Sequence, residues 1–276
     1  MVLVNLIIGI IANVLLFILA LSLIMPRKVF SYSGRKIFDL IYKYRFCIVG
    51  LIVVEMLQNL EVRLVDPIAT EWINMKLGVD YFTDLFYSIE GDLVPTLALW
   101  THQSNFFSWG LMCFFIVIYT QLYPFILWFM PLYFVAEDDR ASRLGIHTFL
   151  VTYAIQFAFM LFLPVTNVFT YMDLDLAIEY LIPNYIDSYY LNTTPNNCFP
   201  SLHVAMPFAA MLASLYSPNK KVKWLTIPSA ILIASSTIYL AIHWILDVLA
   251  GITLATGAFL IAKKLLKREE KEKDAG

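Results

Sequence analysis

The sequence predicts an all-α fold, namely a polytopic membrane helix bundle with a six-helix core and one extra N-terminal transmembrane helix. Two observations support this prediction. First, 60% of the 276 residues are hydrophobic and only 14% are charged, whereas a soluble domain has about 45–50% apolar and about 25% charged residues. Second, the apolar runs are long and continuous, and about 20 apolar residues form a helix that crosses the bilayer core. Backbone polar groups must bond to one another there, which favours helices.

Seven apolar segments are the candidate spans. The first has no basic residue before it and is too long for the core of a signal peptide, so we expect a retained transmembrane helix. The third contains Pro124 and Pro131, so we expect it to be tilted or kinked. The seven segments are about Val2–Leu23, Phe46–Val65, Ser108–Val135, Gly145–Val165, Ser201–Leu215, Val222–Ala241 and Ile245–Leu265.

These spans define two parts of the chain. We expect residues 1–25 to form the extra N-terminal transmembrane helix and residues 26–276 to form one membrane-embedded domain. Within that domain we expect an interfacial segment at 66–107 on the outer side and a cytoplasmic tail at 266–276.

The basic residues predict the orientation in the membrane. Of the 19 Lys and Arg residues, all but Arg63 and Lys76 fall in segments that the topology places on one side. Cytoplasmic loops have the excess of positive charge, so we expect the C-terminus in the cytoplasm and the N-terminus outside. The outer side then receives Asp66–Phe107 and Thr166–Pro200, two long segments whose many aromatic residues suit a membrane interface.

Two short stretches place reactive side chains near this outer face. The first, CFPSLHVA, contains Pro200, Ser201 and His203 at the start of the fifth span. Proline and serine are typical of a helix start, so the motif alone also fits ordinary capping. The free N–H groups of such a helix start can bind an anion, which would then lie beside His203.

The second stretch, YLAIHWILDVLAG, contains His243 and, one helical turn later, Asp247. The two side chains share a helix face, and Asp247 leans toward His243. A carboxylate bonded to one ring nitrogen fixes the tautomer and leaves the other nitrogen basic. Two histidines, one held by a carboxylate and one beside an anion site, suit phosphoryl transfer.

Together the two stretches resemble the type 2 phosphatidic acid phosphatase superfamily of integral-membrane lipid phosphatases and phosphotransferases. The family block PSGH is matched at 200–203 with leucine in place of glycine, and SRxxxxxHxxxD is matched by Ser236, His243 and Asp247. The resemblance implies that His243 is the nucleophile and forms a phosphohistidine, and that Asp247 orients it. It further implies that His203 is the general acid, that Ser201 binds a phosphate oxygen, and that no metal or other cofactor is needed.

The sequence departs from the family pattern in its phosphate-binding cations. Thr237 stands where the last block has arginine, and the block KxxxxxxRP is absent. In this respect the chain is similar to the branch of inositol phosphorylceramide synthases and sphingomyelin synthases, which transfer a phospho-head group to an alcohol. Arg63 and Lys76 are the cations on the predicted outer side, so we expect them to supplement the phosphate site; their alternative role is to snorkel at the interface.

The sequence therefore predicts an integral-membrane lipid phosphatase or phosphotransferase with its active site on the extracytoplasmic face. We expect a lipid phosphate substrate, contacts with membrane lipids and, for transfer, an alcohol acceptor, but no nucleic-acid partner. Two alternatives remain. One is a head-group transferase of the inositol phosphorylceramide synthase type, and the other is a non-catalytic member that binds or moves lipids.

Overall fold

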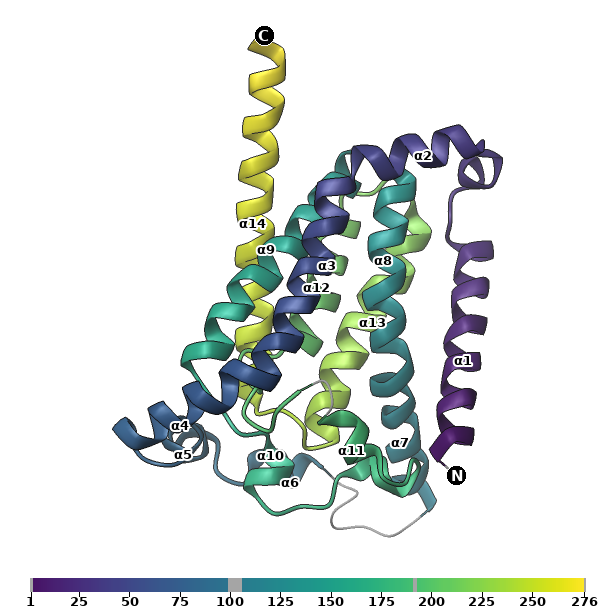
Figure 1. The fold of residues 1–276 in the computed structure, drawn as a ribbon. Coiled ribbons are helices and arrows are strands. Elements are labelled where there is room, and N and C mark those ends of the chain that lie inside the picture. Colours follow the sequence, from purple (N-terminus) through teal and green to yellow (C-terminus); the bar gives the residue numbers. More distant parts are fainter. Residues whose placement is uncertain (1, 99–105, 191–192, 276) are drawn as a thin grey trace.

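The structure, a computed structural model, describes residues 2–98, 106–190 and 193–275 (Figure 1). Within these ranges the chain is helical and has no strand, apart from an isolated parallel bridge between Val165 and Asn197. The predicted all-α polytopic bundle is confirmed. In the described ranges, four helices are long and apolar enough to cross a membrane: Ser108–Glu137, Arg140–Phe162, Lys220–Tyr239 and Ile245–Lys271.

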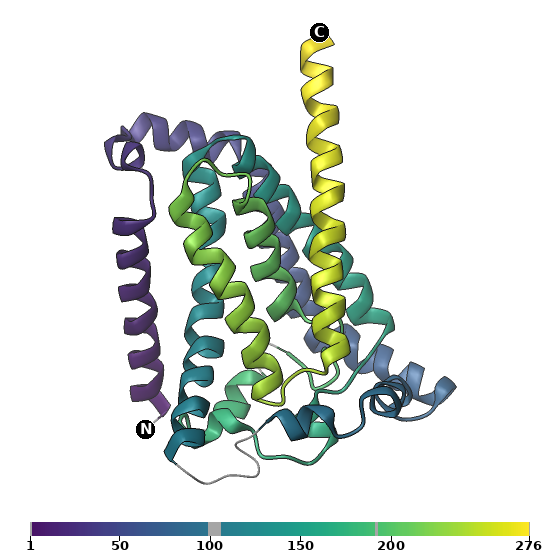
Figure 2. The same cartoon turned by 180° about the vertical axis from the view of Figure 1, so that it is seen from behind.

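The N-terminal helices lie at the periphery of the bundle. They are α1 (Val2–Leu23), the short 3₁₀ helix η1 (Arg27–Ser31), α2 (Gly34–Lys43) and α3 (Arg45–Leu60). Helix α1 stands beside the bundle, and α2 crosses one end of it (Figures 1 and 2). Phe17 of α1 packs edge-on against Phe125 and Phe129, which lie on a core helix.

Two of the predicted spans contain a π-helical turn. Each π turn ends two residues before a proline, Pro67 or Pro124. A proline lacks the backbone N–H and its ring crowds the carbonyl four residues back, so a wider turn is accommodated here. The irregularity expected in the third span is thus a π turn before Pro124. The elements are η2 (Glu61–Val65) between α3 and α4 (Asp66–Leu77), and η4 (Ile118–Leu122) between α7 (Phe106–Val117) and α8 (Tyr123–Glu137).

Helix α12 is the centre of the core. The core consists of α8 together with α9 (Arg140–Phe162), α12 (Leu202–Ser214), α13 (Lys220–Tyr239) and α14 (Ile245–Ala275). The α12 residues Ala205, Ala209, Ala210 and Ala213 are fully buried. Small side chains let helix backbones approach closely in a membrane, which is why a short helix can be enclosed by its neighbours.

The two ends of the bundle differ in the segments that they display. One end carries α2 and the loop at 215–219 between α12 and α13, and α14 projects beyond it (Figures 1 and 2). The opposite end carries short helices from the two aromatic-rich segments. These are α5 (Tyr81–Glu90), α6 (Leu93–Leu97), α10 (Val168–Tyr171), the 3₁₀ helix η5 (Ala177–Tyr180) and α11 (Tyr185–Tyr189).

Gly251 sets the distance between α12 and α14. A Cβ atom there would lie 2.7 Å from the backbone oxygen of Ser201 and 3.2 Å from Cβ of Val204. The nearer atom belongs to the backbone, so a side-chain rotation cannot relieve the contact. Any larger residue must push α14 away from the start of α12.

We predict that Gly251→Ala lowers thermal stability, because overpacking of this kind costs about 1–3 kcal/mol. Thermal unfolding of the detergent-purified protein measures the effect. Gly257→Ala, in the same helix, is the matched control: a Cβ there meets nothing within 4 Å, and alanine has the better helix propensity. Equal melting temperatures for the two variants would refute the close-contact account.

Candidate active site

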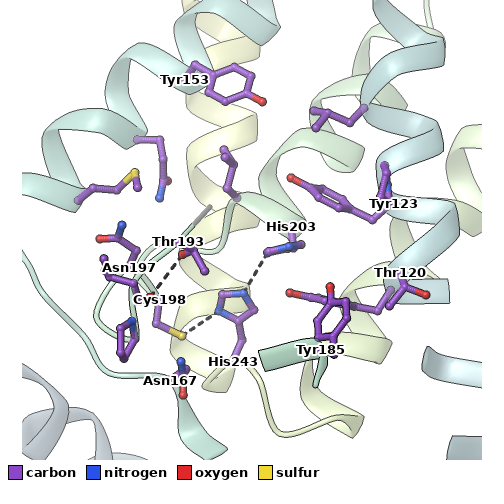
Figure 3. A pocket seen from close by; sticks show the side chains of 18 residues that line it. Thr120, Tyr123, Tyr153, Asn167, Tyr185, Thr193, Asn197, Cys198, His203 and His243 are labelled. Atoms are coloured by element: carbon purple, nitrogen blue, oxygen red, sulfur yellow. Dashed lines mark hydrogen bonds between the residues drawn. The ribbon is translucent and has the colours of Figure 1, made fainter. Parts of the chain in front are cut away.

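A polar cavity of about 380 Å³ lies between η4, α8, α9 and the start of α12. The segment 193–198, the turn between α13 and α14, and the side chains of Asn167 and Tyr185 complete its walls. His203 and His243 both line it and face one another (Figure 3). Because α12 runs from this site toward the loop at 215–219, the cavity lies nearer the end of the bundle that carries the aromatic-rich segments.

The fold brings together three residues that are far apart in the sequence. Nδ1 of His203 lies 3.4 Å from Nε2 of His243, and the ring centroids are 5.6 Å apart. On the other side of the His243 ring, Nδ1 lies 3.4 Å from Oδ2 of Asp247. The order is therefore carboxylate, imidazole, imidazole, with Nε2 of His243 directed toward the cavity.

Asp247 is held by the start of α14. Its Oδ2 accepts a 2.9 Å bond from the N–H of Trp244, the residue before the helix, which is one of the two hydrogen bonds of a capping box. The carboxylate is completely buried, and Oδ1 has no hydrogen-bond partner within the described chain. Asp247 thus has a structural role at the helix start and an electrostatic role beside His243.

Cys198 lies between these two residues, which the sequence did not suggest. Its Sγ is 3.0 Å from Nδ1 of His243 and donates a 2.9 Å bond to Oδ2 of Asp247. The thiol is 3% exposed. The only sequence signal for it is its position two residues before the PSLH block.

A tight turn presents His243 to the cavity. Helix α13 ends in a Schellman motif, in which the N–H of Ile242 bonds to the carbonyl of Thr237 and the N–H of Ala241 to that of Ile238, both at 3.0 Å. Ala241 adopts a left-handed conformation with φ of 55°. Thr237, at the position where the family has arginine, is buried and does not line the cavity.

Contacts with the end segments fix the same turn from outside. The indole N–H of the fully buried Trp244 donates a 2.9 Å bond to the carbonyl of Thr166. Glu90 of α5 accepts the N–H groups of Ile245 at 2.9 Å and Leu246 at 2.6 Å. The pKa of Glu90 is raised on balance, because the effect of burial exceeds the opposing effect of its bonds to these two N–H groups. The free N–H groups of α14 are therefore satisfied by protein carboxylates.

The start of α12 is different, because its first N–H groups remain available. Those of Leu202 and His203 have no acceptor in the described chain. Ser201 is completely buried: its N–H bonds to the backbone oxygen of Asp247 at 3.1 Å, and its hydroxyl has no partner within the described chain. Ser201 does not itself line the cavity. The helix start thus offers donors and a positive dipole end to an anion.

Two amide side chains add polar groups to the wall. Gln156 donates a 2.7 Å bond to the carbonyl of Pro200 and so holds the loop before α12. Its Oε1, and Nδ2 of Asn167, are buried without a partner among the described residues, and both residues line the cavity. Buried polar groups are normally bonded, so these atoms are candidates to contact a ligand.

Tyrosines enclose His203. The ring of Tyr119 stacks at 4.7 Å between centroids, and that of Tyr123 lies at 4.3 Å. Both come from the π turn and the helix start after it, and π turns are frequent at functional sites. Tyr153 and Tyr185 also line the cavity, and burial raises the pKa of Tyr185 to about 12, so it remains a neutral hydroxyl.

The residues that line the cavity, as far as the structure describes the chain, include no lysine or arginine. Arg63 in η2 and Lys76 in α4 are exposed and are not part of the lining. The structure thus does not bring these two cations to the cavity. Among the described lining residues, the groups that can favour an anion are the N-terminal end of α12 and neutral hydrogen-bond donors.

The donor atoms of Cys198, His243 and Asp247 lie within 4.8 Å of one another, and zinc accepts this combination of ligands. Tetrahedral zinc with bonds of about 2.0–2.3 Å needs ligand atoms about 3.5 Å apart. The nitrogen and the oxygen are 3.4 Å apart, which matches, but the sulfur is only 3.0 Å from the nitrogen and 2.9 Å from the oxygen. These spacings fit hydrogen bonds better than a preformed metal site.

A multi-pass helical membrane protein with a histidine pair and a helix start around one polar cavity has the organisation of a membrane-embedded phosphoryl-transfer enzyme. Comparison with protein families gives the class more closely: the model of the PAP2 superfamily matches residues 71–261, more than half of the chain. The chain belongs to this superfamily, which supports a phosphatase- or phosphotransferase-type lipid enzyme. No curated protein and no solved structure matches the chain significantly.

Proposed function

We propose that this protein is a lipid phosphate phosphatase or phosphotransferase that acts through a phosphohistidine on Nε2 of His243. The observation that supports the proposal most directly is the environment of that ring. Nδ1 is engaged by Cys198 and Asp247, while Nε2 is directed into the cavity. Burial lowers the pKa of His243 to about 3, so the imidazole is neutral at physiological pH and Nε2 keeps its lone pair.

The proposed reaction has two displacements. In the first, Nε2 of His243 attacks phosphorus, the N–P bond forms, and the bond to the leaving oxygen breaks as His203, which must enter this step as the imidazolium, gives that oxygen a proton and becomes neutral. In the second, water or an alcohol attacks the phosphohistidine, gives its proton to His203, and the N–P bond breaks. Neither step uses a metal ion.

The anion site for the phosphate is the start of α12. The N–H groups of Leu202 and His203 point out of the helix end, and Nδ2 of Asn167 supplies a further donor. The Ser201 hydroxyl is the remaining candidate in this region, as its place in the motif predicts. Each donor is strengthened by the low-dielectric surroundings.

An apolar groove next to the cavity supports an amphiphilic substrate. It has a volume of about 310 Å³ and lies between α3, α8 and α9. Leu127 and Tyr153 line both the groove and the polar cavity. A lipid with its phosphate beside His243 could place an alkyl chain in the groove, between helices that face the bilayer.

The neutral wall of the cavity favours one alternative, which is transfer of a head group between a phospholipid and an alcohol. A phosphomonoester has about 1.5 to 2 negative charges at neutral pH, whereas a phosphodiester has one. A cavity whose described lining lacks lysine and arginine compensates a single charge more easily than two. The non-catalytic alternative has no comparable support, because the histidine pair and the carboxylate meet.

The orientation proposed from the basic residues places the cavity on the extracytoplasmic side and the C-terminus in the cytoplasm. Cys198 cannot report it because the thiol is buried. Asp187 in α11 and Lys220 at the start of α13 are exposed and come from opposite ends of the bundle. Replaced by cysteine, they allow the two faces to be labelled separately.

His243→Ala should abolish both turnover and the phosphoenzyme, since no other group can form the N–P bond. His203→Ala should slow turnover by about 10²–10⁴-fold, and least for substrates with a good leaving group. The turnover rate of Asp247→Asn should lie between those of the two histidine variants, because the substitution misorients the His243 ring. Product release and trapping of the radiolabelled phosphoenzyme measure these effects. Near-normal turnover of His243→Ala on a verified substrate would refute the mechanism.

Leu127→Trp should narrow the passage between cavity and groove. We expect KM to rise about tenfold or more for long-chain lipid phosphates, equivalent to the lost burial of about two methylene groups, while KM for a four-carbon phosphate ester stays unchanged. Leu132→Trp, at an exposed position of the same helix, is the control. Equal effects on short and long chains would exclude the groove as the chain site.

A product assay separates hydrolysis from transfer. Purified protein is supplied with a lipid phosphomonoester or a phosphodiester lipid, with and without a polyol or a lipid alcohol. We expect the diester with an alcohol to give a new phosphodiester if head-group transfer is the reaction. Release of inorganic phosphate from the monoester alone would favour the phosphatase, and no product under any condition would favour the non-catalytic alternative.

For the orientation, Asp187→Cys should react with a membrane-impermeant maleimide in intact cells, and Lys220→Cys only after lysis. The unsubstituted protein is the control for its own three cysteines. The reverse pattern would place the cavity on the cytoplasmic side.

A further inference from the structure

We propose that Cys198 is a positioning residue for His243, whose thiol bridges the imidazole and the Asp247 carboxylate and so holds the ring in the tautomer protonated at Nδ1. The inference rests on the proposed function only in taking His243 as the nucleophile. Cys198 itself lies outside both of the family blocks that the sequence matches.

The distances show why the bridge matters. Nδ1 of His243 is 3.4 Å from Oδ2 of Asp247, which is beyond the usual 2.7–3.2 Å of an N–H···O bond. The Cys198 sulfur is closer to each, at 3.0 Å from Nδ1 and 2.9 Å from Oδ2. The orienting effect of the carboxylate therefore reaches the ring mainly through the thiol.

The proton count fixes the direction of the bonds. A thiol has one hydrogen, and two oxygens are within its reach: Oδ2 of Asp247 at 2.9 Å and the carbonyl oxygen of Ile242 at 3.4 Å. The nearer one, on the ionised Asp247 carboxylate, takes the hydrogen. The sulfur can then act only as an acceptor toward Nδ1, so Nδ1 must carry a proton. Nε2 is left with the lone pair that faces the cavity.

The surroundings keep the thiol protonated. Burial, followed by the negative charge of Asp247, raises the pKa of Cys198 well above its usual range, and Glu90 adds to the effect. A thiolate in this place would stand beside a buried carboxylate with no cation among the described cavity residues. The neutral thiol is the form that can donate to Asp247.

The backbone holds Cys198 in place independently of its side chain. Its N–H donates a 3.1 Å bond to the carbonyl of Val165, whose own N–H bonds to the carbonyl of Asn196 at 2.9 Å. Gln156 fixes the carbonyl of Pro200 two residues later. Substitution of the thiol thus leaves this segment of chain where it is, so the variants report on the sulfur.

The test compares serine with alanine at this position in the full-length protein. The two side chains differ by one hydroxyl, which can both accept from Nδ1 and donate to Asp247. If Cys198 only filled space, the rate of phosphoenzyme formation in Cys198→Ala should equal or exceed the rate in Cys198→Ser, because a buried hydroxyl costs free energy when it is not bonded. If Cys198 positions the ring, the order is reversed.

We expect Cys198→Ala to slow phosphoenzyme formation in a single turnover by about 100-fold, the usual effect of a misplaced reacting group, and Cys198→Ser to recover most of that loss. Cys113→Ala, in α7 and outside the cavity lining, should match the unsubstituted protein. An alanine variant as fast as the serine variant would overturn the proposal.

A second readout does not depend on turnover. In ¹⁵N-histidine-labelled protein, the signals of His243, assigned by their loss in His243→Ala, should show Nδ1 protonated in the unsubstituted protein and in Cys198→Ser. Cys198→Ala should show a mixture of tautomers. Absence of phosphoenzyme from every form would refute the phosphohistidine mechanism, and the tautomer would still decide the role of Cys198. An unchanged tautomer in Cys198→Ala would overturn it.

Discussion

The close contact between α12 and α14 is the constraint on which the rest of the site depends. On the α14 side the contact is made by Gly251, which has no side chain and lies against the carbonyl of Ser201. A hydrogen bond from the Ser201 N–H to the backbone oxygen of Asp247 also joins the two helices here. This contact brings the start of one helix, with His203, to the start of the other, with Asp247. The distance between the two rings is therefore set by backbone packing, which is stiffer than any pair of side chains.

The two helix starts that meet here have different electrostatic roles. The start of α14 is filled by Glu90 and Asp247, whose carboxylates accept its first N–H groups. The start of α12 has N–H groups without an acceptor in the described chain and opens toward the cavity. An incoming anion is thus attracted to one end and repelled from the other, although the ends are neighbours. This asymmetry can place a phosphate without the arginine that the family motif contains.

Sequence alone predicted the fold class, because hydropathy reports the bilayer directly, and it placed the histidines and Asp247 on segments that the structure does bring together. The spacing of His243 and Asp247 was sufficient to predict their contact, because residues four apart share one face of a helix. It could not reveal Cys198, Tyr119 or Tyr123, whose roles depend on tertiary contacts. Nor could it tell that Arg63 and Lys76 lie outside the lining of the cavity, since the π turn in η2 decides where the following helix leads. The proline after each π turn was the one feature of the sequence that indicated an irregular turn there.

The hydrogen bonds around His243 also constrain its partner. If Cys198 and Asp247 keep the proton on Nδ1, Nε2 of His243 is an acceptor, so at the 3.4 Å contact with His203 only Nδ1 of that ring can supply a proton. The proton of the proposed general acid then points at the place where the substrate must enter. A phosphate can reach Nε2 only by replacing this contact, because in-line displacement needs the attacking and leaving groups on opposite sides of phosphorus. The tyrosines on both sides of His203 limit where its ring can go. Substrate binding would thus exchange the contact between His203 and His243 for a hydrogen bond from His203 to the substrate, while the buried thiol and carboxylate keep the proton of His243 on Nδ1.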